Sequence, residues 1–167
     1  MNVITESEWL QTKLQRLAVE GFVRLEQDGK AEVGIEAIAR RTRFEISKFG
    51  FSETFFIFRR FDSLNAQALR DFSSNAFRLA KLSKTIPLPC GVFESVWCFA
   101  VAVADQVDGT AAESVRNVAP PMHWAAAEIP VIFNQADRRL YYFEKTPLWG
   151  AAYYSGFRSQ IKRFLDS

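Results

Sequence analysis

The stretch Val96-Trp-Cys-Phe-Ala-Val-Ala-Val-Ala104 decides the fold of this chain. It carries no charge and no alternation of apolar with polar residues, which is the pattern of a strand buried on both faces of a sheet. It is also much shorter than the roughly 18 apolar residues that span a bilayer, and no other apolar run approaches that length. The sequence therefore predicts a central strand at residues 96–104 and no transmembrane segment.

Strand and helix signals alternate on both sides of this stretch. Residues 54–60 are rich in aromatic and β-branched residues, and they precede a helix, capped by Asp62 or Ser63, with an apolar stripe. Thr110-Ala-Ala-Glu113 is a capping box that opens a short helix with Val115, Val118 and Ala119 inward, and residues 129–134 read as the next strand. A β-α-β-α-β series of this kind folds most simply with its strands parallel.

The two ends of the chain extend this core. Residues 6–20 predict a first helix, and the Asp28-Gly29 turn between residues 22–27 and 30–35 predicts a hairpin. Residues 43–49 read as a further strand, whereas 36–43 fit helix and strand equally well. Residues 140–145 predict a last strand, and Tyr154, Phe157 and Ile161 form the apolar stripe of a closing helix.

We therefore predict an α+β fold: a single domain over residues 1–167 with a mixed, mostly antiparallel sheet of five to seven strands. Its β-α-β-α-β core carries helices packed on it. With 49% apolar residues and 16 phenylalanines, the chain can build a large aromatic core without a metal or a disulfide.

Charge and cysteine content restrict the classes of partner and compartment. There are 21 basic and 19 acidic residues, so the net charge does not favour nucleic acid or an acidic membrane as a partner. Of the two cysteines, Cys98 lies within the apolar run, and no signal peptide precedes the first helix. These features predict a reduced, cytoplasmic protein that is not bound to a membrane.

Polar residues follow the ends of the three strands expected to be parallel. Arg59 and Asp62 end the first, Asp105 follows the second and Asn134 ends the third. Open sheets bind ligands at this edge, and grouped oxygens could hold Mg²⁺ while Arg59 faces a phosphate, as in a metal-dependent phosphoester hydrolase. The alternative is a structural role, in which Asp62 caps a helix while Asp105 and Asn134 satisfy turn amides. Because no spacing rule links these residues, we expect no resident metal or cofactor.

His123 is the only histidine, which removes sites that require several histidines. A nucleophilic pair with Cys90 would require the two side chains to meet within hydrogen-bond reach. Cys90 in a proline-flanked loop and His123 beside Trp124 have simpler roles in a turn and in packing.

The string Ile35-Glu-Ala-Ile-Ala-Arg-Arg41 resembles the second helix of a TetR-type helix-turn-helix. The resemblance covers about 35 residues and implies that Arg43, Ser47 and Lys48 lie on a helix entering the major groove. It departs from that family in the turn after Arg41, which lacks a small residue, and in the strand-rich remainder. A DNA-binding regulator is thus one alternative function.

The aromatic residues near the C-terminus suggest a partner surface. Tyr142 and Trp149 belong to the densest group of amphipathic aromatics, beside a last strand expected at the sheet edge. We therefore expect a small cytoplasmic binding or protein-interaction module that is not an enzyme, and whose partner is a second copy or another protein. Nucleic acid is possible but not favoured.

Overall fold

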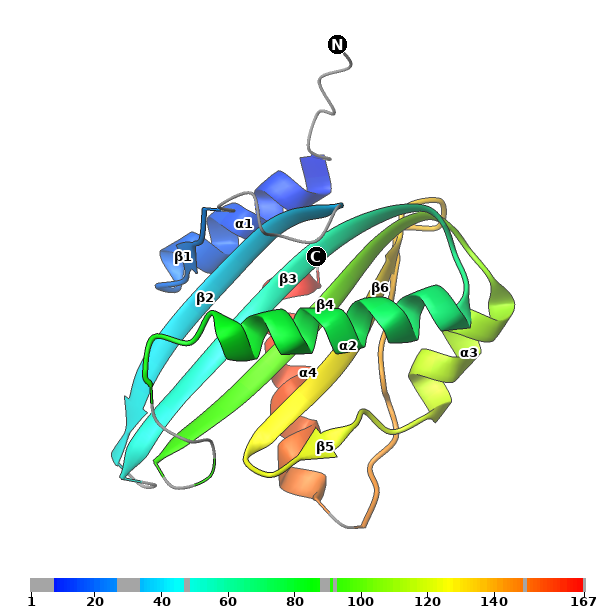
Figure 1. Ribbon diagram of the computed structural model, residues 1–167. Helices are drawn as coiled ribbons and strands as arrows, with labels where there is room; N and C mark the ends of the chain where they lie inside the picture. The colour runs from blue at the N-terminus through cyan, green and yellow to red at the C-terminus, as the bar shows by residue number, and fades with distance from the viewer. Residues whose placement is uncertain are drawn as a thin grey trace.

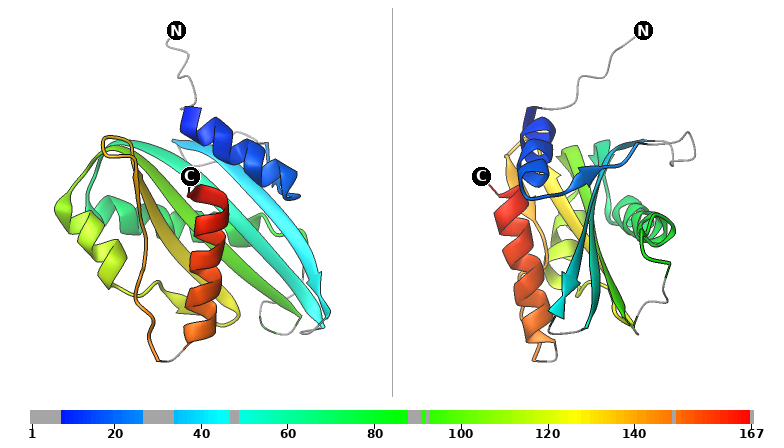
Figure 2. Two further views of the ribbon diagram at one scale, coloured as in Figure 1. Left: turned by 180° about the vertical axis from the view of Figure 1, so that it is seen from behind. Right: turned by 90° about the vertical axis from the view of Figure 1, so that its left-hand side faces the viewer.

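The fold is one curved sheet with helices on both faces (Figures 1 and 2). The computed structural model describes residues 8–26, 34–46, 49–87, 91, 93–148 and 150–166. Within them, no helix combines the length and the apolar character needed to cross a membrane. The elements in chain order are α1 (Glu8–Val19), β1 (Val23–Arg24), β2 (Ile35–Glu45), β3 (Gly50–Leu64), α2 (Ala66–Leu82), β4 (Glu94–Val107), α3 (Gly109–Asn117), β5 (Met122–His123), β6 (Ala126–Asn134), β7 (Arg139–Tyr141) and α4 (Ala151–Leu165).

The strand order is β1-β2-β3-β4-β6-β5, and β7 also pairs with β6. The strands β3, β4 and β6 are parallel and are joined through α2 and α3, whereas every other pairing is antiparallel. This confirms the predicted mixed sheet, its β-α-β-α-β core and the interior position of residues 96–104.

The strand β4 separates two hydrophobic cores, because its successive side chains point to opposite faces. Cys98, Ala100 and Ala102 face α2 and α3, and their small volume suits the close approach of α2. Phe99 and Val101 face α1 and α4, where large aromatic side chains fill the layer. All five are fully buried, which explains why the run lacks polar residues.

The segment that resembles a helix-turn-helix forms β2 instead. Ile35, Ala37, Ile38 and Ala39 are buried, and the strand pairs with β3 over most of its length. Burial of the side chains on both faces of this strand outweighs the helical propensity of its alanines. There is no recognition helix at residues 35–45, and Ser47 and Lys48 lie outside the described residues.

The structure corrects several predicted boundaries. Asn65 caps α2 by accepting from the amide of Ala68, and Asp108 caps α3 by accepting from the amide of Thr110. Val118 and Ala119 follow α3 and are exposed. The last strand ends at Tyr141, because Phe143 turns into the core and contacts Tyr154. The Asp28-Gly29 turn lies outside the described residues.

We expect Phe56→Ala to lower the free energy of unfolding by roughly 3–5 kcal/mol, since it empties the centre of the aromatic core. Phe56 is fully buried, and its ring stacks on Phe99 at 4.6 Å and meets Phe164 edge-on at 5.6 Å. Urea unfolding of Phe44→Ala, which truncates a half-exposed phenylalanine on β2, is the control and should change stability by about 1 kcal/mol or less. Equal losses in the two variants would contradict this description of the core.

Candidate functional site

The structure divides the polar residues predicted at the carboxyl ends of the parallel strands between the two faces of the sheet. Arg60 and Asp105 form an ion pair at 3.2 Å on the α1 side, and Gln135 donates a hydrogen bond to Asp105. Arg59 lies on the α2 side, where its guanidinium covers the ring of Phe61 at 4.9 Å. Adjacent strand residues point to opposite faces, so Arg59 and Asp105 do not share a site.

The two remaining oxygen residues of the predicted site have separate positions. Asn134 accepts a hydrogen bond at 3.0 Å from the amide of Ala136, the turn role expected of an asparagine there. Asp62 is exposed within β3. Among the described residues, no group of three or more His, Cys, Asp or Glu side chains is placed to hold a metal ion.

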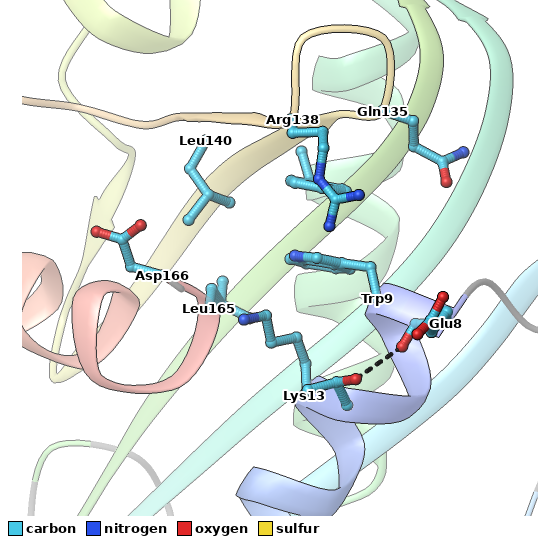
Figure 3. A pocket seen from close by; sticks show the side chains of 10 residues that line it. Glu8, Trp9, Lys13, Gln135, Arg138, Leu140, Leu165 and Asp166 are labelled. Atoms are coloured by element: carbon cyan, nitrogen blue, oxygen red, sulfur yellow. Dashed lines mark hydrogen bonds between the residues drawn. The ribbon is translucent and has the colours of Figure 1, made fainter.

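A pocket of about 500 Å³ lies on the α1 side of the same sheet edge (Figure 3). We call it the Trp9 pocket. Its wall combines α1, the β6–β7 hairpin and the end of α4, through Glu8, Trp9, Thr12, Lys13, Phe133, Gln135, Arg138, Leu140, Leu165 and Asp166. Gln135 joins it to the Arg60–Asp105 pair, so the Trp9 pocket occupies the edge where ligands bind in open sheets.

The turn of the β6–β7 hairpin presents Arg138 to the pocket. Asp137 accepts from the amide of Arg139 at 3.1 Å and from the hydroxyl of Tyr141 at 2.6 Å, which closes the turn. Arg138 takes a left-handed backbone conformation, with φ of 55°. Its side chain then extends toward the indole of Trp9 (Figure 3).

Trp9 forms the apolar floor of the pocket. Its indole stacks on Phe133 with ring centroids 3.9 Å apart and an interplanar angle of 6°. Phe58 meets the same indole edge-on, with ring centroids 6.5 Å apart. Rings from β3 and β6 thus hold Trp9 in one orientation, leaving little rotamer freedom to lose when a ligand binds.

Lys13 is the unusual group of the Trp9 pocket, because only 3% of its surface is exposed. Burial lowers the pKa of Lys13, nearby Arg16 lowers it further, and Asp166 opposes both effects. Its ammonium lies 5.6 Å from the centre of the Trp9 indole. Lys13 and Asp166 approach the pocket from α1 and from the end of α4 (Figure 3). A desolvated cation therefore lines a cavity that can admit an anion.

Two polar contacts between the regions of α1 and α4 hold this geometry. Arg16 donates to the backbone oxygen of Asp166 at 2.7 Å, and Arg163 forms an ion pair with Glu20 at 2.6 Å. The first of these satisfies a carbonyl just beyond the end of α4. Both contacts fix α1 across α4, so Lys13 keeps its position beside Leu165.

Sequence reasoning missed the pocket residues Trp9, Lys13 and Arg138. A signal for Lys13 existed, since it follows Leu10 by three residues and precedes Leu17 by four, on the buried stripe of α1. Nothing in the sequence brings Arg138 to Trp9, because that contact depends on how α1 packs on the hairpin.

The other predicted candidates lie elsewhere or outside the described residues. Tyr142 is half-buried against the α4-side core, and burial, Asp166 and Glu144 raise the pKa of its hydroxyl. His123 stacks on Phe77 at 4.5 Å. Trp149 and Cys90 lie outside the described residues.

We expect Lys13→Met to stabilise the fold by about 1 kcal/mol or less near neutral pH, because it replaces a buried cation with an apolar side chain of similar size. The pKa of Lys13 is lowered on folding, so the wild-type protein gains stability as pH rises through the interval below the ordinary lysine value of 10.5. The advantage of the variant should therefore shrink on going from neutral pH to about pH 10.

Urea unfolding at the two pH values measures this change. Lys162→Met, which removes an exposed lysine from α4, is the matched control and should show no such dependence. A stability difference for Lys13→Met that stays constant with pH would contradict a desolvated ammonium at this position.

Comparisons with models of protein families, with curated proteins and with solved structures give no match to this chain. A function for the Trp9 pocket must therefore follow from the geometry, burial and charge of its own residues. Those properties describe a preformed, partly apolar cavity with a buried cation in its wall.

Proposed function

We propose that this protein is a binding module without catalysis, and that the Trp9 pocket takes a small amphipathic anion. The observation that carries the proposal is the buried ammonium of Lys13 in the wall of a pocket of about 500 Å³. In the described part of the chain, no carboxylate forms an ion pair with Lys13. A bound anion would supply the missing charge and would recover part of the desolvation cost.

The shape of the pocket supports a ligand with a flat apolar body. The indole of Trp9 and the side chains of Leu140 and Leu165 provide apolar surface, while Arg138 adds a second cation. Aromatic ligand rings gain from stacking on such a platform as well as from burial.

Acidic groups also line the Trp9 pocket, and their positions matter. Glu8 and Asp166 are both exposed, whereas Lys13 is buried. Water and salt screen exposed charges much more than buried ones, so the field inside the pocket favours an anion although the formal charges balance.

A role without catalysis fits the way this sheet edge uses its polar side chains. Asp105 is held by Arg60 and Gln135, and Asn134 is engaged by the turn amide of Ala136. The phosphoester hydrolase alternative needs these oxygens to converge on a metal. Their present contacts support binding over that alternative.

We expect naphthoate to bind more tightly than naphthylmethylamine and naphthalenemethanol, because the three share an aromatic body and differ in charge. Titration calorimetry measures the three affinities on the full chain. Lys13→Met should weaken naphthoate binding roughly 10- to 100-fold, the usual range for losing a charge-assisted contact. Lys162→Met is the control and should leave the affinity unchanged.

Two results would contradict this proposal. One is equal affinity for the three naphthalene compounds, which would mean that the pocket binds only their apolar body and does not select an anion. The other is naphthoate binding that is unaffected by Lys13→Met in a folded protein, which would place the anion elsewhere.

We also propose self-association, supported by a surface at the other end of the sheet. Beyond its pairing with β1 at Ala39 and Arg40, the outer edge of β2 has no strand partner among the described residues. Phe44 lies on this stretch, and Ile46 and Phe49 beside it are largely exposed. Pairing of this edge with the same edge of a second copy would be antiparallel and self-complementary.

This surface differs from the one expected from the sequence. The predicted interface centred on residues 140–145 and Trp149, but Phe143 is buried and Tyr142 packs against the core. The exposed apolar side chains at the end of β2 offer more surface to a partner.

We expect the wild-type protein to sediment faster as its concentration rises, and Ile46→Lys to weaken the dimer at least roughly tenfold by placing a charge in the apolar contact. Gln15→Lys adds the same charge to an exposed position on α1 and should leave the association unchanged. A monomer at every concentration would refute self-association through β2.

The cytoplasmic location is part of the proposal and is supported by cysteine chemistry. Cys98 is a free, fully buried cysteine, and burial together with Glu128 raises the pKa of its thiol well above the ordinary value. The thiol therefore stays protonated and unreactive, as suits a structural cysteine in a reducing compartment.

A further inference from the structure

A second cavity, of about 410 Å³, lies on the opposite side of the sheet from the Trp9 pocket. It is a groove between α2 and α3 above β6, the region at the right of the sheet in Figure 1. We call it the α2–α3 groove. Its walls are mostly apolar and include Leu69, Val115, Pro120 and Pro130. Two buried polar side chains, Ser73 and Glu128, interrupt this surface.

Ser73 presents an unused hydroxyl to the groove. The residue is 2% exposed, and its Oγ has no hydrogen-bond partner among the described residues. A serine within a helix ordinarily bonds a backbone carbonyl of the preceding turn or points to solvent. An unsatisfied buried hydroxyl destabilises the fold, and a ligand that bonds to it would recover the lost interaction.

Glu128 is one of three buried glutamates on this face in the described part of the chain, and the other two each have a clear partner there. Glu53 accepts from the amides of Thr85 and Ile86 at 2.9–3.0 Å. Glu94 forms an ion pair with Lys84 at 2.5 Å. These two acids anchor the segment that leads from α2 toward β4.

Among the described residues, neither a backbone amide nor a lysine is paired with Glu128. It is 8% exposed, and it lies beside His123, whose Nε2 is 3.7 Å from Oε2. That separation exceeds a hydrogen bond. The imidazole of His123 is also held by its stacking on Phe77, which limits its approach to the carboxylate.

We propose that the α2–α3 groove binds a small apolar primary amine, with its ammonium between Glu128 and Ser73. An ammonium carries three donors and one positive charge, which matches an incompletely paired carboxylate and an unsatisfied hydroxyl. The hydrocarbon body lies against Leu69, Val115 and the prolines. Arg70 also lines the groove, but it is exposed and donates to Gln67 at 2.8 Å, so its charge is more screened than that of Glu128.

The test uses hexylamine, hexanoate and hexanol, which share one alkyl chain and differ in the head group. On the full-length protein, titration calorimetry should give hexylamine the highest affinity. Amide chemical shifts should change in α2, α3 and β6 and stay constant in α1, which separates this site from the Trp9 pocket. Lys13→Met should not alter hexylamine binding, so the two proposals can fail independently.

Two substitutions examine the head-group contacts. Glu128→Gln keeps the size of the side chain and removes its charge, and it should weaken hexylamine roughly 10- to 100-fold. Ser73→Ala should weaken binding less, by roughly 3- to 10-fold, while leaving the protein as stable or more stable because an unsatisfied hydroxyl is removed. Glu113→Gln, on the exposed side of α3, is the charge-matched control.

Several outcomes would overturn the proposal. They are an absence of hexylamine binding, binding of hexanol or hexanoate with equal affinity, or a folded Glu128→Gln protein with wild-type affinity. If Glu128→Gln does not fold, Ala119→Trp replaces it, because this exposed residue lines the groove and an indole there would occlude it. Wild-type affinity in folded Ala119→Trp would then exclude the groove as the site.

Discussion

Burial of β4 on both faces is the constraint on which the rest of the structure depends. A strand with no solvent-facing side must have a helix layer above and below it, and its neighbours must pair along nearly its full length. Here β3 and β6 flank it in parallel, which forces crossover connections and supplies α2 and α3 to one face. The opposite face is closed by the helices at the two ends of the chain, α1 and α4.

The two layers differ in side-chain size, and this difference locates the two cavities. Toward α2, β4 presents mainly cysteine and alanine, so the helix lies close and the remaining space is a groove at its side, next to α3. Toward α1 and α4, phenylalanines fill the layer, and the gap occurs at the sheet edge, where α1, the β6–β7 hairpin and the end of α4 meet around Trp9. The position of each cavity thus depends on how much of one sheet face is covered by the helices packed on it.

Buried charges distinguish these cavities from ordinary packing gaps. Two other buried acids have clear partners, because Glu53 receives two backbone amides and Glu94 forms an ion pair with Lys84. Lys13 and Glu128 are buried to a similar degree, but the described residues offer them no amide pair or close ion pair of this kind. Because an uncompensated buried charge is costly, such groups tend to mark places where a ligand completes the structure. The ligands proposed for the two faces therefore carry opposite charges.

By itself, the sequence determined the fold class, the interior strand and most of the elements. Residues 96–104 specify a doubly buried strand, and Tyr154, Phe157 and Ile161 specify the buried face of α4, because hydrophobic periodicity is a local property of the chain. Only the tertiary structure decided that residues 36–43 form a strand, since their pattern fits either a helix or a strand and the pairing with β3 selects the strand. It also decided that Arg59 and Asp105 separate and that Trp9, Lys13 and Arg138 converge. Arg138 is more than a hundred positions from Trp9 and Lys13 in the chain. These placements depend on strand register and on helix packing, which local patterns do not encode.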